Sequence, residues 1–366
     1  MDEDQAFKAT RLQRVQKKLN EPLHDSHHTL TPTTIQKYLD YQKKLTNLGV
    51  DLDNIHDVED LYQKIQHIPL VRKSGFISPS SCGDYLNALS YFLKHKEHKT
   101  DHDIYVQCYL GVILNDITAV KKLKQAQNNN AGKQAVNYID WIKVQEVYDL
   151  LKANKDANKQ CSKNFLLLSL YFLMPVRRRT DYGLMVVVNS EKDAQLSNDF
   201  NYYVNTDKGF FIFNQYKTSN TYFQQILIIN DDLDKIIKRY INKYKITGSL
   251  LKYKSVRSIT EALTNIFKSY LVQNIDDSLD DKIKPKRVSI NILRHAYISH
   301  LTQSGKLDTL HKRNIISKAM AHSVLQQLEY VKDPNKKFTQ VDEDRLMKEL
   351  KNSIINGERI SLAGII

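Results

Sequence analysis

The hydrophobic and polar positions of the chain repeat mostly with helical spacing. Between residues 33 and 123, apolar and aromatic residues recur three and four positions apart, as in "TIQKYLDYQKKLTNLG" and "SCGDYLNALSYFLKH". This spacing is typical of amphipathic helices, and it predicts a small helical bundle. The apolar stretch "FLLLSLYFLMPV" at residues 165–176 is too short to cross a bilayer. We predict that it forms a buried helix, and we expect no membrane association.

Strand patterns follow this apolar stretch. The runs "DFNYYVN", "GFFIFNQYKT" and "YFQQILIIN" are rich in aromatic and β-branched residues, and "TDKG" and "SNT" between them are typical of turns. They predict a three-stranded antiparallel meander with Lys217 at its second turn. Helical patterns then resume in "DDLDKIIKRYINKY" and "NILRHAYISHL". The predicted fold class is mainly α with a small antiparallel β-sheet (α+β).

A loss of periodicity in "KQAQNNNAGKQAV" indicates a boundary between two domains. We predict a basic N-terminal arm or linker at 1–30, a helical domain at 31–127, a linker at 128–137, and a second domain with a C-terminal tail at 138–366. Basic residues near helical spacing in "KATRLQRVQKK" indicate either a solvated helix face or an arm that contacts DNA. The tail "DEDRLMKELKNSIINGERISLAGII" is typical of an amphipathic helix and an apolar end, which either folds back on its own domain or docks on a neighbouring protomer.

The charge balance favours a polyanionic partner. The 366 residues include 54 Lys and Arg against 41 Asp and Glu, for a net charge of +13. Nucleic acid fits this excess best, and an acidic membrane surface is second. The three cysteines are widely spaced and contain no C-x-x-C pair, which argues against a disulfide framework or a zinc site and favours a reduced, intracellular protein. The opening "MDEDQAF" does not have the pattern of a secretory signal. We expect no metal and no cofactor.

Five polar residues are candidates for chemistry in the second domain. They are Arg177 in "MPVRRRTDY", Lys217 in "QYKTSN", Arg294 in "NILRHAYISHL", His322 in "MAHS" and Tyr330 in "LEYVK". Each alone has an ordinary interpretation, because such residues commonly cap helices, face solvent or pack. Together they suit the cleavage of a phosphodiester without a metal. Guanidinium groups bind its non-bridging oxygens, a lysine protonates the leaving oxygen, and a tyrosine forms the covalent link.

These blocks resemble the tyrosine recombinases, the phage-type integrase family. The segments "ILRHAYISHL" and "MAHSVLQQLEY" carry the resemblance, which covers roughly residues 138–335, and "LMPVRRRTDYGLM" is further similar to integrases of virophages. The resemblance implies a helical core-binding domain plus a catalytic domain. It also implies site-specific recombination through a 3′-phosphotyrosine link without metal or ATP, double-stranded DNA as partner, and a homo-tetramer on DNA. The expected location is the host-cell nucleus or a viral replication compartment.

The resemblance also implies a role for each candidate. Arg177 is the first phosphate-binding arginine, with Arg178 as the alternative because an alignment within three arginines can slip by one. Arg294 is the second arginine and Lys217 the general acid. His322 donates a hydrogen bond to the phosphate, and Tyr330 is the nucleophile. Further DNA contacts are implied for Arg178, Arg179 and His295, although His295, like His300, has packing or orientation of Arg294 as its alternative.

Three departures from the family pattern affect this interpretation, and one is that Tyr330 follows His322 by eight residues, about one short of the commoner spacing. Asn291 stands where the family often has a histidine. An asparagine can donate a hydrogen bond to a phosphate but takes no proton at neutral pH, so the general base for Tyr330 is unassigned. Ala321 stands where a glycine usually precedes the histidine, and we expect it only to tighten packing. The alternatives are a type IB topoisomerase-like enzyme and a non-catalytic DNA-binding protein, which Asn291 leaves open.

Overall fold

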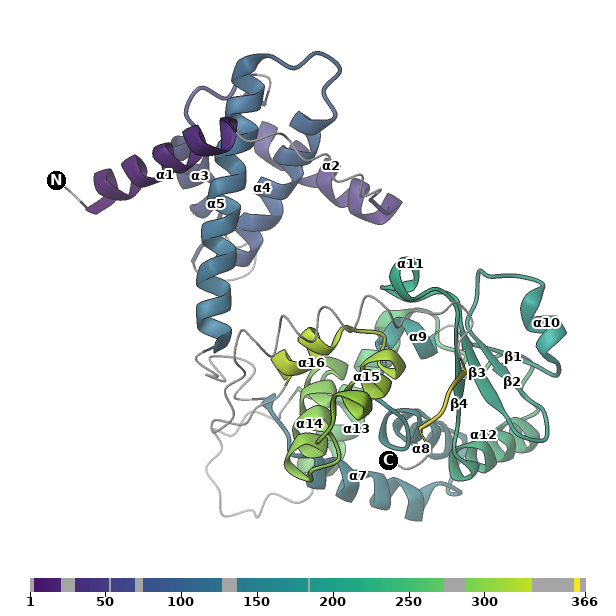
Figure 1. Cartoon of the computed structure of the whole chain (residues 1–366). Helices are drawn as coiled ribbons and strands as arrows, with labels where there is room; N and C mark the ends of the chain where they lie inside the picture. Colours follow the sequence, from purple (N-terminus) through teal and green to yellow (C-terminus); the bar gives the residue numbers. More distant parts are fainter. Residues whose placement is uncertain are drawn as a thin grey trace. The chain divides into compact units, whose positions relative to one another are not determined.

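The chain forms two compact units, residues 1–129 and 130–366, in the computed structural model shown in Figure 1. The structure describes residues 3–20, 30–52, 54–69, 75–126, 137–183, 185–272, 287–330 and 359–362. The predicted linker lies almost wholly outside these residues. Each unit has its own hydrophobic core. Within the described ranges, no helix combines the length and the apolar character needed to cross a membrane.

The first unit is helical. Its helices are α1 (Glu3–Leu19), α2 (Pro32–Asn47), α3 (Val58–Gln66), α4 (Pro79–Lys94) and α5 (Asp101–Ala126). Local sequence explains where three of them begin, because the side chains of Thr31, Asp57 and Ser78 each accept a hydrogen bond from a backbone N–H of the first turn. The apolar positions of α2 to α5 that repeat with helical spacing supply most of the unit's core. The helical patterns predicted for this part of the sequence are therefore present.

Part of the N-terminal segment predicted as a basic arm or linker is a helix packed on the bundle. Helix α1 packs against α5. Arg11 is only 6% exposed, and it donates to both carboxylate oxygens of Glu59, at 2.9 and 3.0 Å, and to Asp116 at 2.9 Å. Tyr109 donates to the same Glu59 at 2.8 Å. Arg11 therefore joins α1 to α3 and α5, whereas Lys17 of the same helix is exposed, so a solvated face and a DNA contact stay predictions for the other basic residues.

The second unit is built around a six-stranded sheet of mixed direction. Its order is β5-β1-β2-β3-β4-β6. Strands β2, β3 and β4 form the predicted antiparallel meander, but β1 runs parallel to β2 and β6 parallel to β4. The prediction of a purely antiparallel sheet is therefore wrong, because the added strands are two or three residues long and carry no alternating pattern. The strands are β1 (Val186–Val188), β2 (Tyr202–Val204), β3 (Phe210–Phe213), β4 (Gln225–Ile228), β5 (Gly248–Ser249) and β6 (Arg359–Ile360).

The two faces of this sheet pack on different clusters. Tyr203, Phe211, Phe213 and Leu227 belong to the main core of the unit. Their strand neighbours, which include Tyr202, Val204, Phe210 and Ile226, belong to a smaller cluster completed by Ala194 of α10 (Glu191–Gln195). Successive side chains of a strand point to opposite faces, so both faces of the meander are covered.

Helices surround the main core on the inner side of the sheet (Figure 1). The predicted buried helix is α8, which ends at Phe172 and packs against α7, α12 and α13. The chain then runs through Met174 and Val176, both buried, directly into the arginine run. The helices are α7 (Trp141–Asn154), α8 (Lys159–Phe172), α9 (Arg179–Gly183), α11 (Ser219–Tyr222), α12 (Asp231–Tyr244), α13 (Val256–Val272), α14 (Ile290–Gln303), α15 (Leu310–Ala319) and α16 (Val324–Tyr330).

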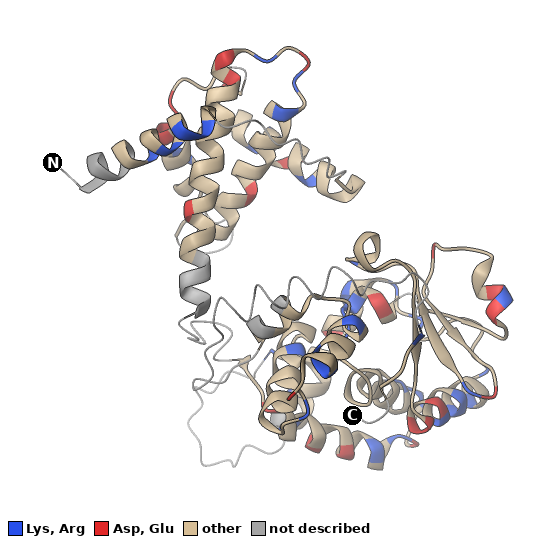
Figure 2. Cartoon of the chain, in the orientation of Figure 1, with Lys and Arg blue, Asp and Glu red and all other residues tan. Residues whose placement is uncertain are grey.

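Part of the C-terminal tail folds back on its own unit. Strand β6 pairs with β4, with Ile226 opposite Arg359 and Leu227 opposite Ile360. Arg359 also pairs with Glu191 at 3.1 Å. The helix predicted earlier in the tail lies outside the described residues. Figure 2 shows Lys and Arg interspersed with Asp and Glu over both units.

Candidate active site

The C-terminal end of α15 is where most of the candidate side chains meet. The last carbonyl groups of a helix have no partner within the helix and need donors from elsewhere. Here the backbone carbonyls of residues 318 to 321, called the carbonyl row below, accept hydrogen bonds from side chains of four other segments. The donors are Gln225 to Lys318 at 3.0 Å, Arg177 to Ala319 at 2.7 Å, Arg294 to Met320 at 3.4 Å, and Arg178 and Thr218 to Ala321 at 2.9 and 3.0 Å.

Arg177 is the most enclosed of these donors, with no exposed surface. Its Nε donates to Asp181 at 2.8 Å, and its Nη1 donates to Gln225 at 2.9 Å as well as to the carbonyl row. The guanidinium carbon lies 3.8 Å from the centre of the Phe213 ring. Only its Nη2 has no hydrogen-bond partner. Asp181 lies four residues after Arg177, so one turn of the chain brings the two charges together.

Arg294 and Tyr330 are in direct contact. Arg294 is 1% exposed, and its Nε donates to the Tyr330 hydroxyl oxygen at 3.3 Å. Its Nη1 donates to the carbonyl of Val176 at 2.5 Å, which links α14 to the segment just before the arginine run. Burial lowers the pKa of Arg294, although Tyr330 acts in the opposite direction. The predicted second arginine and the predicted nucleophile are therefore neighbours in space, although 36 positions separate them.

His322 lies within this cluster as a neutral imidazole. It is 3% exposed, and its ring centre is 5.4 Å from that of Tyr330. Burial lowers the pKa of His322 well below its usual value, and the positive charges of Arg294, Arg178 and Arg177, in decreasing order of effect, lower it further. Neither ring nitrogen has a hydrogen-bond partner among the described residues. One nitrogen can therefore donate to a ligand and the other can accept.

The charges of this cluster do not balance. Arg177, Arg178 and Arg294 bring three positive charges, Asp181 brings one negative charge, and His322 is neutral. Among the described residues, the cluster thus keeps two uncompensated positive charges, and that of Arg294 lies at the Tyr330 hydroxyl. Such charge in a largely buried site favours an anion, because screening by water is weak there.

Lys217 lies beside the cluster without entering it. The connection between β3 and β4 carries it, so its predicted position between two strands is correct, although that connection includes the short helix α11. Lys217 is exposed, and none of the described contacts joins its side chain to another candidate residue. Its neighbour Thr218, by contrast, is fixed to the carbonyl row through Ala321.

The remaining candidates lie at the edge of the cluster. Arg178 is partly exposed, whereas Arg179 and Asn291 are exposed, and Asn291 lies in the first turn of α14, one turn before Arg294. His295 packs edge-on against Tyr330 with ring centres 4.7 Å apart, and its Nδ1 lies 3.2 Å from the Tyr330 carbonyl oxygen. His295 therefore packs against Tyr330, whereas the alternative from sequence had it packing against or orienting Arg294. His300 lies against Trp141, away from these contacts.

Ala321 has a different role from the tighter packing that its sequence position suggested. Its φ of 53° is in the left-handed region, which an alanine side chain disfavours by about 1 to 2 kcal/mol. This turn ends α15 and aims the Ala321 carbonyl at Arg178 and Thr218. The backbone strain is therefore located at the attachment point of two side chains of the site.

Three contributors to the site were not identified from the sequence. Asp181, Gln225 and Thr218 hold candidate residues or their segments. A signal was present for two of them. Asp181 follows Arg177 at the spacing of one helical turn, and Gln225 is a polar residue at the start of the hydrophobic strand run. Thr218 carried no such signal.

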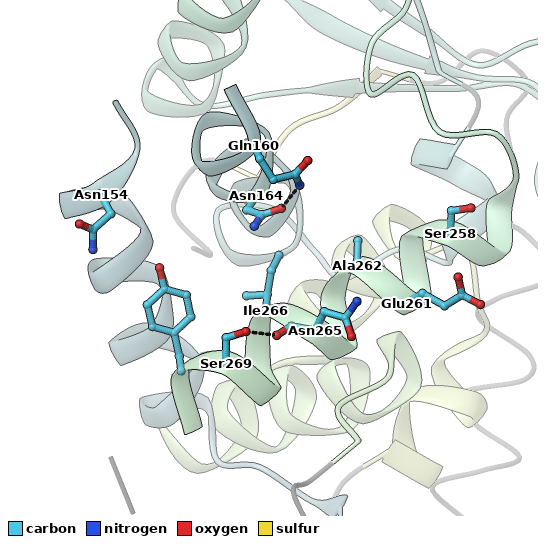
Figure 3. Close-up of a pocket in the computed structure, with 10 residues that line it drawn as sticks. Asn154, Gln160, Asn164, Ser258, Glu261, Ala262, Asn265, Ile266 and Ser269 are labelled. Carbon is cyan, nitrogen blue, oxygen red and sulfur yellow. Dashed lines mark hydrogen bonds between the residues drawn. The ribbon is translucent and has the colours of Figure 1, made fainter. Parts of the chain in front are cut away.

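A cavity of about 680 Å³ lies elsewhere in the second unit, between α7, α8 and α13 (Figure 3). Its lining is mostly amide and hydroxyl groups, such as Asn154, Asn164 and Ser258, and Gln160 donates to Asn164 at 2.7 Å. None of the candidate residues lines it. The cavity is therefore separate from the cluster around Tyr330.

Comparisons with known proteins add little to this geometry. No family model matches the sequence, and no curated protein matches it. Among solved structures, the chain is similar to the crystal structure of XerA recombinase, with 11% identity and a TM-score of 0.36 over 94% of this chain and 98% of that one. A likeness at this level does not establish a shared family. The function proposed below therefore rests on the site itself and on the sequence resemblance.

The strain at Ala321 predicts that Ala321→Gly stabilises the protein. Glycine adopts a positive φ freely, so the release of strain exceeds the entropy cost of an added glycine, and we expect a gain of up to about 1 kcal/mol in the free energy of unfolding. Ala319→Gly is the matched control, because Ala319 ends the regular part of α15 and glycine should destabilise it. Urea denaturation of both variants measures this, and two changes of the same sign would exclude strain at Ala321.

The low pKa of His322 predicts a loss of stability in mild acid. The unfolded chain takes up a proton on His322 near pH 6.5, whereas the folded protein resists it. The contribution of neutral His322 to the free energy of unfolding is therefore complete above pH 6.5. It declines as the pH falls toward the pKa of His322 in the folded protein, by up to about 1.4 kcal/mol per pH unit. His322→Gln should remove it. Denaturation at pH 7.5 and 5.5 compares the two proteins, and an equal pH dependence would show that His322 titrates normally.

Proposed function

We propose that this protein cleaves and rejoins DNA as a tyrosine recombinase, through a covalent bond between Tyr330 and a DNA 3′ phosphate. The observation that carries this proposal is the buried contact between Arg294 and the Tyr330 hydroxyl inside a cluster with two uncompensated positive charges. A phosphodiester would supply what such a site lacks, namely a negative charge and oxygen atoms that accept hydrogen bonds. The net charge of +13 supports DNA as the carrier of that phosphodiester.

Arg294 and Arg178 are the arginines that we assign to the scissile phosphate. Arg178 has a larger effect than Arg177 on the pKa of His322, and it also lowers the pKa of Arg294. Arg178 is partly exposed and has one hydrogen bond to the carbonyl row, whereas Arg177 is enclosed and bonded to Asp181 and Gln225. Of the two alternatives from sequence, we therefore assign the phosphate contact to Arg178. Arg177 stabilises the site through its hydrogen bonds without contacting the phosphate.

The reaction begins with attack of the Tyr330 oxygen on phosphorus. A bond forms between phosphorus and the phenol oxygen, and the bond to the 5′ oxygen breaks. The phenol proton passes to the neutral imidazole of His322, which takes the role that Asn291 cannot fill. The bound phosphate adds negative charge beside the arginines, so the pKa of His322 rises when the substrate arrives. Its other nitrogen donates to a phosphate oxygen.

Lys217 protonates the leaving 5′ oxygen in this proposal. Rejoining reverses the steps, because the phosphotyrosine bond keeps the energy of the original phosphodiester. Neither ATP nor a metal is needed for the balance of atoms and charge. Guanidinium donors held in place before the substrate binds stabilise the charge that builds on the phosphate, without any reorganisation during the reaction.

The further parts of the proposal rest on the sequence resemblance. Site-specific exchange by four protomers on two duplexes, and integration of a mobile or viral genome, are implied by the blocks around Arg178, Arg294 and Tyr330. A type IB topoisomerase-like activity would use the same chemistry on one duplex. Relaxation of a supercoiled plasmid that lacks the target sequence, without exchange between molecules, would favour that alternative.

Covalent capture tests the nucleophile. Purified protein incubated with fragments of its own genome and quenched in SDS should yield DNA linked through tyrosine at its 3′ phosphate, and Tyr330→Phe should yield none, because phenylalanine lacks the attacking oxygen. DNA binding by Tyr330→Phe serves as the control for folding. Sequencing the attached ends locates the cleavage site. No adduct under conditions where the wild type binds DNA would instead indicate a non-catalytic DNA-binding protein.

Separate substitutions of the two neighbouring arginines test their assignment. Arg178→Met should lower the rate of covalent capture by about 100-fold or more with little effect on stability. Arg177→Met should reduce the free energy of unfolding by about 3 to 5 kcal/mol, because it leaves the buried carboxylate of Asp181 unpaired. Denaturation and capture rates are measured on both. A stable Arg177→Met protein that does not cleave DNA would indicate that Arg177, and not Arg178, contacts the phosphate.

A further inference from the structure

The connection that carries Lys217 is attached to the carbonyl row near its middle and at the strand residue that follows it. It comprises residues 214–224 and is closed by the β-sheet pair Phe213 and Gln225. Within the connection, Thr218 donates to the Ala321 carbonyl at 3.0 Å, and Gln225, the first residue of β4, donates to the Lys318 carbonyl at 3.0 Å. Both bonds cross between segments that are about 100 positions apart in the chain. The connection is thus tied to the same helix end as the arginines.

Thr218 is the attachment nearest to Lys217. The Lys217 side chain is exposed, so packing does not fix its direction. The position of Lys217 therefore depends on its backbone. The next residue, Thr218, holds that backbone to Ala321. The same carbonyl accepts from Arg178 at 2.9 Å. The Ala321 carbonyl therefore accepts hydrogen bonds both from the segment that carries Lys217 and from Arg178, the arginine assigned to the phosphate.

We propose that Thr218 is a positioning residue for Lys217. Its hydroxyl, bonded to the Ala321 carbonyl, keeps the lysine beside the phosphate held by Arg178 and Arg294, so that the ammonium reaches the leaving oxygen. This rests on the proposed function, in which Lys217 is the general acid. Without the hydroxyl the lysine is still present and charged, but its position is no longer restricted, and small displacements of a catalytic group reduce rates strongly.

A substrate with a sulfur in place of the leaving 5′ oxygen separates this role from general damage. A thiolate leaves without protonation, so a defect that acts through the general acid disappears on this substrate. The probe is the duplex that carries the captured cleavage site, made with either oxygen or sulfur at the bridging 5′ position. With oxygen, Thr218→Val should cleave about tenfold more slowly than the wild type and Lys217→Ala more slowly still. With sulfur, both should approach the wild-type rate.

Two matched variants complete the design. Thr218→Ser keeps the hydroxyl and should restore cleavage of the oxygen substrate. Thr221→Val makes the same chemical change at an exposed position in the same connection and should have no effect. Gln225→Met, which removes the bonds to Arg177 and the carbonyl row, should slow both substrates equally, because its effect does not pass through the general acid.

The outcomes distinguish this proposal from the one on which it rests. If the wild type forms no adduct, the proposed function fails and the role of Thr218 fails with it. If Lys217→Ala recovers with sulfur but Thr218→Val does not, Lys217 is the general acid and Thr218 acts elsewhere, for example through Arg178. Hydrogen exchange checks the attachment directly. Thr218→Val should speed exchange in residues 214–224 and Thr218→Ser should not, and equal protection in the two would overturn the proposal.

Discussion

The end of a single helix determines the geometry of the whole candidate site. Helix α15 stops at Ala319, and the carbonyls there need hydrogen-bond donors that the helix cannot supply. Arginine side chains are well suited to this position, because their positive charge also interacts favourably with the negative end of the helix dipole. Three of them come from two distant segments and are fixed by the same few carbonyls. The sheet contributes through Gln225 and the β3–β4 connection through Thr218.

This arrangement has an energetic cost that the fold must offset. Enclosed guanidinium groups lose their hydration, which is expensive unless donors and charges are matched. Arg177 is matched by Asp181 and Gln225, and the Phe213 ring covers its face. Among the described residues, the hydrogen-bond acceptors of Arg294 are all neutral, namely carbonyls and the Tyr330 hydroxyl. Its charge and that of Arg178 stay uncompensated, and His322 responds by remaining neutral. The electrostatic cost of burial thus falls mainly on Arg178, Arg294 and His322, the groups that would contact a bound anion.

The sequence predicted the elements of the site better than their connections. Helical spacing and strand alternation are local, so the meander and the helices bearing Arg294 and Tyr330 could be predicted from it. The contact of Arg177 with Gln225 spans 48 positions and depends on how β4 approaches α15, which no local pattern encodes. The positive φ of Ala321 was missed because alanine rarely adopts a left-handed turn, although the glycine expected at this position was a sign of it. Arg11 shows the same limit, since its basic neighbours suggested solvent or DNA while its partners Glu59 and Asp116 lie far along the chain.

Differences in burial determine which side chain of the site an incoming phosphate can contact first. Arg294, His322 and Tyr330 are at most 6% exposed, whereas Arg178 is partly open to solvent. In the proposed function, an incoming phosphate would therefore encounter Arg178 first, and Arg178 is already oriented by the Ala321 carbonyl. Charge brought to that point reduces the repulsion between Arg178 and Arg294 and raises the pKa of His322. The phosphate itself would thus turn a strained cationic cluster into a balanced one, with the acceptor for the Tyr330 proton becoming more basic only when a substrate is present.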